Sequence, residues 1–131
     1  MNEKVLCDTC TLIDFVNGKS NAISQLYQQN KILFINPIIE LELLQGARNK
    51  KEMHYLEDKL EMFYKLEMPS EIFQLARELI KMYALSHGLR LADALIASTA
   101  LTYDLTLFTL NINDFKFIPA LQILPLKKTS K

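Results

Sequence analysis

VLCDTCTLIDF, residues 5 to 15, places an acid directly after a short apolar run and a second acid inside the next one. The first run, residues 5 to 7, predicts a buried strand that stops at Asp8, and residues 11 to 17 predict a short helix. A carboxylate at the edge of a core destabilises the fold unless it is hydrogen-bonded, paired or bound to a cation. The position of Asp8 therefore requires either a structural partner or a ligand.

Beyond this stretch, short apolar segments alternate with helical patterns. We expect further strands at residues 31–35 (KILFI), 105–110 (LTLFTL) and 121–124. We expect helices at residues 22–29, 37–46, 51–66, 70–87 and 91–103. Asn36 followed by Pro37 predicts the start of the helix at 37–46. Helices between short apolar strands indicate parallel strands joined by right-handed crossovers. The predicted fold is therefore a three-layer α/β/α sandwich with a short, mainly parallel sheet.

Length and charge set broad limits on the protein. The 131 residues predict a single domain, residues 1–126, followed by a polar tail, residues 127–131. Lysine plus arginine and aspartate plus glutamate each total 15, so overall basicity does not indicate a nucleic-acid partner. No apolar run has the length of a membrane-spanning helix, and the sequence MNEKVLCDT does not resemble a signal peptide. We therefore expect a cytoplasmic protein.

The two cysteines, Cys7 and Cys10, have a C-x-x-C spacing that raises the question of redox or zinc chemistry. Asp8 lies between them, and a neighbouring anion raises the pKa of a thiol. A zinc site would need two more ligands, and the only histidines, His54 and His87, are distant in the sequence and isolated from each other. We therefore favour two small packing residues at the end of a strand.

Four acids stand apart from those in the charge-rich helices. Asp8 and Asp114 follow predicted strands, and Asp93 opens a helix of small and apolar residues. Glu42 lies in the segment IIELELLQGA, which is so apolar that we expect little of it to face water. Each has a plain structural alternative, because Asp8 and Asp93 also suit helix caps and Asp114 suits a turn. If all four instead meet at the carboxyl edge of one parallel sheet, they repel one another unless a cation binds between them. Oxygen ligands of this kind favour Mg²⁺ or Mn²⁺.

Four segments, in this order, resemble the PIN-domain ribonucleases, and most closely the VapC-type toxins of bacterial toxin–antitoxin pairs. They cover most of the chain: VLCDTCTLIDF (5–15), IIELELLQGA (38–47), GLRLADALIASTAL (88–101) and LFTLNINDF (107–115). The resemblance implies a PIN-like fold and a metal-dependent endoribonuclease. It also implies that Asp8, Glu42 and Asp93 are the three principal acids, with Asp8 and Asp93 as the main metal ligands.

The same resemblance assigns the remaining site residues. Glu42 is preferred to Glu40 because Leu43 and Gly46 follow it at the spacing of the family motif. The fourth acid often follows its strand at once, whereas this chain has Asn111 there and an acid, Asp114, three residues later. We prefer Asp114 as the fourth ligand, with Asn111 as a polar helper, and Asn111 is the alternative for the fourth position. The hydroxyl groups of Thr9 and Thr109 are expected to orient carboxylates or water.

The chain also carries basic residues that could hold an RNA backbone beside these acids. They are Arg48, Lys50, Lys51 and Arg90, and each is equally compatible with an exposed helix end. RNA rather than DNA is an implication of the resemblance, as are a homodimer and inhibition by a small antitoxin protein. Mg²⁺ is the expected cofactor, with Mn²⁺ as a substitute.

Three other functions remain compatible with the sequence. One is a housekeeping PIN nuclease that processes RNA without an antitoxin. Another is an inactive PIN fold that binds RNA or protein, which Asn111 at the fourth position would suit. The third is a thiol oxidoreductase that uses Cys7 and Cys10.

Overall fold

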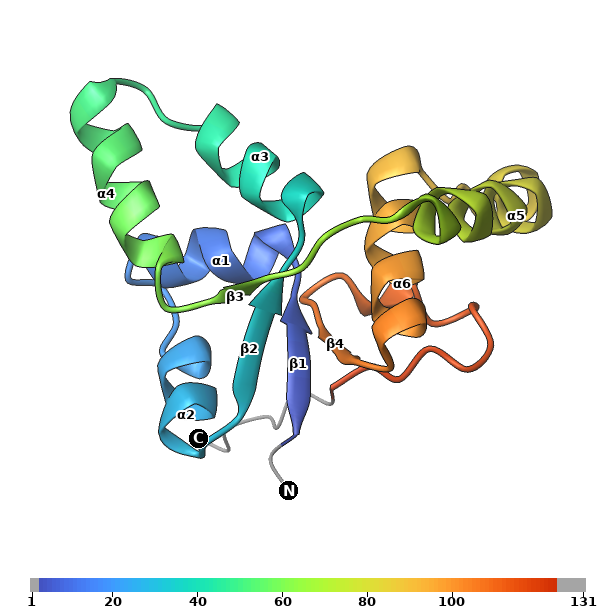
Figure 1. Ribbon diagram of the computed structural model, residues 1–131, viewed down its shortest axis with the longest axis horizontal. Helices are drawn as coiled ribbons and strands as arrows, with labels where there is room; N and C mark the ends of the chain where they lie inside the picture. Colours follow the sequence, from blue (N-terminus) through green and yellow to red (C-terminus); the bar gives the residue numbers. More distant parts are fainter. Residues whose placement is uncertain (1–2, 125–131) are drawn as a thin grey trace.

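The computed structural model describes residues 3–124, in which four parallel strands form one sheet flanked by helices (Figure 1). The strands are β1 (Lys4–Cys7), β2 (Ile32–Ile35), β3 (Tyr64–Lys65) and β4 (Thr106–Phe108). The helices are α1 (Thr9–Val16), α2 (Ala22–Gln28), α3 (Pro37–Gln45), α4 (Lys50–Leu60), α5 (Ser70–His87), α6 (Leu91–Tyr103) and the 3₁₀ helix η1 (Ile112–Asp114). In Figure 1, α2 and α4 lie on one side of the sheet and α5 and α6 on the other. The predicted three-layer α/β/α sandwich is confirmed.

The apolar run of the opening stretch is buried because β1 has a strand on each side. The sheet order is β3-β2-β1-β4, so β1 pairs with both β2 and β4. Val5, Leu6 and Cys7 are 0% exposed. A central parallel strand covered on both faces is expected to be continuously apolar rather than alternating.

The strand order also fixes where a site can form. The chain runs from β1 outward through β2 to β3 and then returns to the other side of β1 as β4. Crevices in open α/β sheets form beyond the carboxyl ends of the strands at such a reversal. Asp8 directly follows β1 and Thr109 directly follows β4, so both lie at this switch point.

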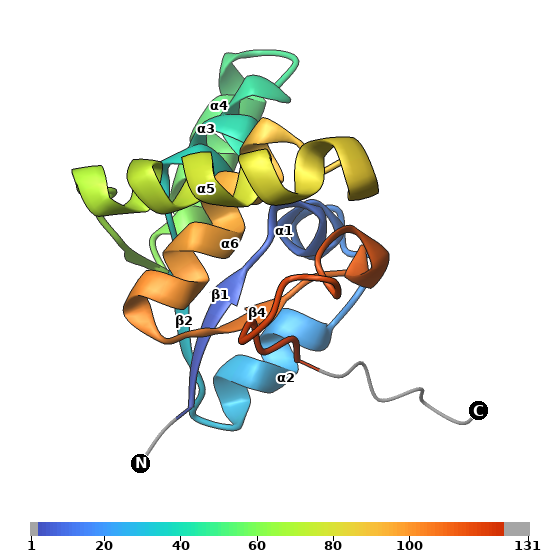
Figure 2. The same ribbon diagram turned by 90° about the vertical axis from the view of Figure 1, so that its right-hand side faces the viewer.

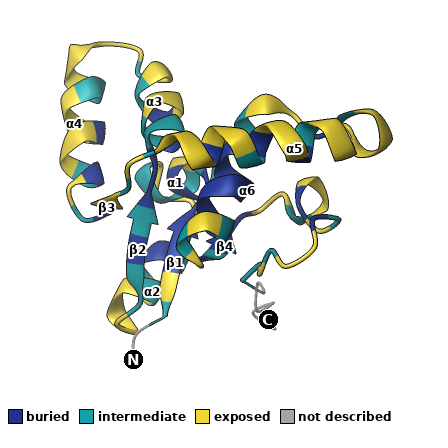
Figure 3. Ribbon diagram, turned by 45° about the vertical axis from the view of Figure 1, so that its right-hand side comes forward, coloured by how far each residue is buried: buried dark blue, intermediate teal, exposed yellow. Residues whose placement is uncertain are grey.

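Helix α6 is the most deeply buried helix in Figure 3. Residues 94–100, with the sequence ALIASTA, are buried without interruption, and α6 packs against α5, α3 and β4. The small side chains of this segment allow close approach on several sides. The first turn of α6, which carries Asp93, is therefore attached to a rigid element.

Two parts of the prediction are wrong in detail. The helix predicted at residues 51–66 ends at Leu60, and the chain then forms the two-residue strand β3, both residues of which are exposed. A strand this short has no detectable period, so the sequence pattern missed it. The strand predicted at residues 121–124 is reduced to one bridge between Leu107 and Ile123.

Other expectations concern the ends of the chain and the membrane. The predicted polar tail, residues 127–131, and the last residues of the predicted domain lie outside the described residues. Within residues 3–124, none of the helices combines the length and the apolar character needed to cross a membrane.

A buried amide ties α3 to α6. Asn36, which is 1% exposed, caps α3 by accepting a hydrogen bond from the Ile39 amide at 2.9 Å. Its Nδ2 donates to Thr99 Oγ1 at 2.9 Å, and the Thr99 hydroxyl donates to the Leu95 carbonyl at 2.8 Å. Because the helices that carry Glu42 and Asp93 are joined here, Asn36 holds their relative positions.

We expect Asn36→Ala to lower the free energy of unfolding by about 2–4 kcal/mol, because it removes a cap and leaves buried groups unpaired. Asn49 is the matched control, since it caps α4 in the same way but is exposed. Asn49→Ala is expected to cost only about 1 kcal/mol. Urea unfolding of both variants measures the difference, and equal losses would show that the Asn36–Thr99 bond contributes nothing.

Candidate active site

Asp8 is both a helix cap and the most deeply placed acid of the predicted set. Its Oδ1 accepts a hydrogen bond from the Thr9 amide at 2.7 Å, which caps α1. Its Oδ2 accepts from the Thr109 hydroxyl at 2.7 Å and from the Cys10 thiol at 3.5 Å. The side chain is 4% exposed. Asp8 can therefore cap α1 and also be an acid of the candidate site, because its hydrogen bonds fix the carboxylate at the end of β1.

Glu42 lies on the face of α3 that approaches α1, but it is not buried. The expectation that the apolar segment around it would exclude water is wrong, because Glu42 is exposed and its neighbour Leu41 is 62% exposed. The Thr9 hydroxyl donates to Glu42 Oε1 at 2.6 Å, which orients this carboxylate. Glu40 instead forms an ion pair with Lys65 at 3.1 Å. The structure thus gives the two glutamates different surroundings.

Asp93 carries the clearest electrostatic signal in the site. It is half-buried in the first turn of α6, and burial together with the negative charges of Asp8, Asp114 and Glu42 raises its pKa from the ordinary 3.8 to about 6. The positive charge of Arg90 has the opposite effect and lowers the pKa of Asp93. Asp93 is not a helix cap, since Arg90 occupies the N-cap position. All three other predicted acids therefore lie close enough to Asp93 to disfavour its charged form.

Two residues after β4, Asp114 and Asn111, are the candidates for the fourth residue of the site. Asp114 is exposed at the end of η1, and its charge acts on Asp93. Asn111 is also exposed and contributes its backbone, whose amide donates to Thr109 Oγ1 at 3.0 Å. Thr109 thereby links this turn to Asp8 through its own hydrogen bond to that carboxylate.

The cysteines do not form a reactive pair. Both are free, and Cys7 is completely buried, which raises the pKa of its thiol well above the usual range. Burial also raises the pKa of Cys10, whose thiol lies against Asp8. Thiols that remain protonated are poor nucleophiles, so the structure gives no support to a thiol oxidoreductase.

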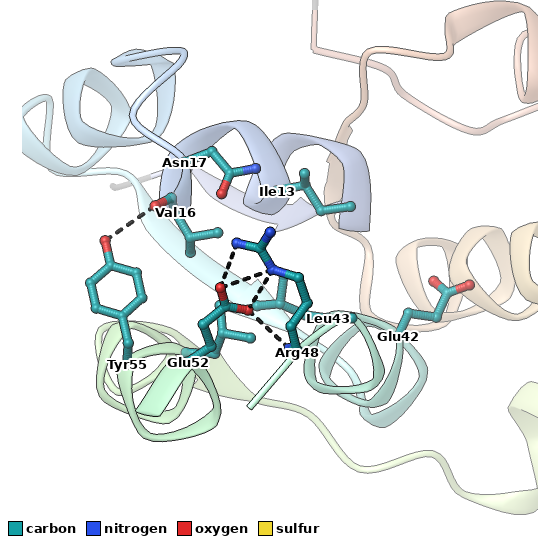
Figure 4. A pocket seen from close by; sticks show the side chains of 10 residues that line it. Ile13, Val16, Asn17, Glu42, Leu43, Arg48, Glu52 and Tyr55 are labelled. Carbon is teal, nitrogen blue, oxygen red and sulfur yellow. Dashed lines mark hydrogen bonds and ion pairs between the residues drawn. The ribbon is translucent and has the colours of Figure 1, made fainter. Parts of the chain in front are cut away.

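A pocket of about 430 Å³ lies between α1, α3 and α4, and Glu42 lies on its rim (Figure 4). Its apolar walls include Ile13, Val16, Leu43 and Leu56. The sequence did not predict this pocket, because its lining comes from three helices that meet only in the folded chain.

The basic residues proposed to contact RNA differ in availability. Arg48 lies beside the pocket and forms a two-pronged ion pair with Glu52, with Nη2–Oε2 and Nε–Oε2 distances of 2.6 and 3.0 Å (Figure 4). This pair would have to open before Arg48 could bind a phosphate. Lys50 and Lys51 are exposed in the first turn of α4, and Arg90 is exposed beside Asp93.

The donor chemistry of the site suits a hard divalent cation. Burial and the charges of Asp8, Asp114 and Glu42 raise the pKa of Asp93, and together they outweigh the opposing charge of Arg90. In the part of the chain that the structure describes, no group of three or more Asp, Glu, His or Cys side chains is arranged so that it could hold a metal ion as it stands. The fit therefore rests on the type of donor and on the mutual repulsion, not on a formed coordination shell.

Comparison with known proteins identifies the family. The family model described as PIN domain matches residues 5–120. A ribonuclease VapC of Rickettsia bellii is 31% identical, with 94% of this chain and 98% of that protein covered. A toxin–antitoxin complex from Klebsiella pneumoniae contains a chain that is 28% identical, with a TM-score of 0.75 and coverage of 89% and 94%. The VapBC2 structure of Rickettsia felis bound to a promoter DNA fragment shares the fold, with a TM-score of 0.80, 23% identity and coverage of 95% and 99%. From the fold, the arrangement of the acids and these matches together, the chain belongs to the PIN domain family.

Proposed function

We propose that this protein is a metal-dependent endoribonuclease and the toxin of a toxin–antitoxin pair. The observation that carries the proposal is that the charges of Asp8, Glu42 and Asp114, which belong to distant segments of the chain, all act on Asp93 and help to raise its pKa. The relatives named ribonuclease VapC and the toxin–antitoxin complexes with the same fold support the choice of RNA and of a toxin role.

In this proposal the four acids hold one or two Mg²⁺ or Mn²⁺ ions. Asp8 and Asp93 would be the main ligands, with Glu42 and Asp114 binding directly or through water. A bound ion would lower the pKa of a water and neutralise charge that develops on the phosphate during hydrolysis. Thr109 and Thr9 keep the carboxylates of Asp8 and Glu42 in place through hydrogen bonds of 2.7 and 2.6 Å.

The RNA backbone would be held by basic residues around the acids. Arg90 is the strongest candidate because its charge already acts on Asp93, which in this proposal would lie beside the reacting phosphate. Lys50 and Lys51 would contact the strand farther away, and Arg48 would contribute only after leaving Glu52.

We further propose two protein partners, an antitoxin and a second copy of the chain. The solved complexes with this fold support the antitoxin. Exposed apolar side chains support a homodimer, because Met82 and Leu85 on α5 are 57% and 102% exposed, and Leu91 at the start of α6 is 67% exposed. Sedimentation velocity of the purified protein tests for the homodimer, and a monomer at all concentrations would exclude the homodimer.

The function is tested by incubating the purified protein with a panel of structured RNAs in Mg²⁺, in Mn²⁺ and in EDTA. We expect cutting at a few sites with either metal and none in EDTA. RNA binding without cutting under every condition would instead favour the inactive binding module. Indiscriminate trimming of all RNAs would favour a housekeeping nuclease.

A second prediction concerns metal binding without RNA. Because ligand binding to the folded state alone adds RT ln(1 + [L]/Kd), Mg²⁺ at a hundred times its Kd should raise the free energy of unfolding by about 2.7 kcal/mol. Asp93→Asn should remove most of this gain. Thermal unfolding with increasing Mg²⁺, with Ca²⁺ and NaCl at matched ionic strength as controls, measures it. An equal response to NaCl would indicate simple charge screening.

A further inference from the structure

Three aromatic rings form a cluster that the proposed chemistry does not use. His87, the last residue of α5, stacks on Phe117 with ring centroids 4.4 Å apart and an interplanar angle of 19°. Tyr83 packs against both, with centroids 5.7 Å from His87 and 5.2 Å from Phe117. The cluster thus joins the end of α5 to the segment that follows η1. We call these three residues the aromatic cluster.

The His87 ring is held in a fixed orientation at the surface. The Ser86 hydroxyl lies 2.8 Å from its Nδ1, and among residues 3–124 no hydrogen-bond partner is found for Nε2. Phe117 covers one face of the ring, while the residue as a whole is exposed. Because the residue is exposed, ring surface that Phe117 does not cover is open to a flat ligand that can stack on it.

The cluster is connected to the acids by two short stretches of chain. After His87, Gly88 ends α5 in the left-handed conformation with φ 70°, and α6 begins at Leu91, so that Asp93 follows within its first turn. Phe117 comes three residues after Asp114, which sets an upper limit of about 11 Å on the separation of their Cα atoms. Figure 2 shows the end of α5 and the segment after β4 on the same side of the molecule.

Each of these two stretches of chain carries a positively charged side chain. Arg90 is exposed between His87 and Asp93, and Lys116 is exposed next to Phe117. Stacking rings combined with cations are typical of sites for unpaired nucleotides, because the rings hold bases and the cations hold phosphates. A protein partner would have less need of a stacked imidazole with a cationic residue on each of the two adjoining stretches of chain.

We propose that His87, supported by Phe117, is a stacking platform for one unpaired base of the RNA substrate beside the phosphate that is cut. This inference rests on the proposed function, because it names a subsite of the same nuclease. Base–aromatic stacking is sequence-tolerant, so the platform would favour an unpaired nucleotide at that position rather than one particular base.

The test uses the full-length protein and a short RNA that spans the strongest wild-type cut site of the panel. His87→Ala should raise the Kd of this RNA in EDTA roughly five- to hundredfold, whereas His87→Tyr should keep it within about threefold. His54→Ala is the matched control, because His54 is an exposed histidine on α4. Circular dichroism and the melting temperature confirm that each variant is folded.

The decisive comparison removes one base from the RNA instead of the His87 ring from the protein. An abasic nucleotide at one position next to the cut should weaken wild-type binding as much as His87→Ala does, and should have no further effect on that variant. Fluorescence of 2-aminopurine at the same position should be quenched by the wild type and by Asp93→Asn, but not by His87→Ala. A merely structural role of His87 would not produce this dependence on position.

Different failures have different meanings. If the wild type cuts no RNA with any metal, the proposed function and this inference both fail. If the wild type cuts but His87→Ala binds and cuts as well as His54→Ala, only the stacking platform is overturned. If His87→Ala binds RNA normally but loses a protein partner, the cluster is a protein-binding surface and the inference is overturned.

Discussion

Asp93→Asn is expected to reduce metal-dependent RNA cleavage more than about a hundredfold while making the metal-free protein more stable. Loss of residues that only support metal ligands already costs about 10- to 100-fold, so loss of a ligand should cost more. Stability should rise because the substitution removes the charge that Asp8, Asp114 and Glu42 repel. The two effects have opposite signs, so general unfolding cannot explain them together.

The stability gain should depend on pH. The folded-state pKa of Asp93 is raised from 3.8 to about 6, so the folded protein holds this proton more tightly than the unfolded chain. The stabilisation is therefore complete below about pH 3.8 and is lost as pH rises through about 6. After allowance for its partial exposure, the loss amounts to about 1–2 kcal/mol. Asp93→Asn should lack this loss, so its advantage over the wild type should be larger at pH 7.5 than at pH 5.

Urea unfolding in EDTA at these two pH values measures the effect. Asp58→Asn provides the control, because Asp58 is an exposed acid on α4 and lies outside the site. It should cut RNA at the wild-type rate and show the wild-type pH dependence. An Asp93→Asn protein that still cuts RNA, or that is less stable than the wild type at pH 7.5, would contradict the assignment of Asp93 as a metal ligand.

Asp8→Ala should lose cleavage to a similar extent but should also lose stability. Asp8 caps α1 and accepts hydrogen bonds from the Thr9 amide and the Thr109 hydroxyl while almost fully buried. Removing the carboxylate leaves these donors unpaired, which should cost about 1–3 kcal/mol. This differs from Asp93, whose charge is opposed by its surroundings and not held by a cap.

Asp8→Asn separates the two roles of Asp8. Asparagine keeps an oxygen that can cap α1, so much of the stability should return, but its neutral amide binds a hard cation more weakly than a carboxylate does. Cleavage should therefore remain lost in a well-folded protein. Denaturant unfolding and RNA cleavage of both variants provide the comparison. Recovery of cleavage in Asp8→Asn would mean that Asp8 acts only as a cap.

The fold was predictable because its signals are local. The strand at residues 5 to 7 and the helix at 91–103 follow from apolar runs and small residues, and Asn36 followed by Pro37 sets the start of α3. The strand β3 could not be found in this way, because two exposed residues form it only by pairing with β2. Its existence depends on a neighbour and not on its own composition.

The sequence predicted which acids belong to the candidate site, but it did not predict the surroundings of these acids. Motif spacing selected Glu42 over Glu40, and the structure pairs Glu40 with Lys65 and Glu42 with Thr9. The apolar sequence of α3 nevertheless suggested a buried Glu42, which is in fact exposed. Hydropathy averages over a helix and cannot tell which of its faces remains uncovered.

The sequence by itself determined which residues are candidates for the chemistry, since each acid belongs to a short motif, and it determined the main strands and helices, since these depend on local periodicity. Only the tertiary structure decided that the charges of Asp8, Glu42 and Asp114 act on Asp93, that Lys65 pairs with Glu40, and that His87 stacks on Phe117. The physical reason is that charge interactions and ring stacking depend on distance through space. In a parallel sheet with crossovers, residues about a hundred positions apart, such as Asp8 and Thr109, come within 2.7 Å.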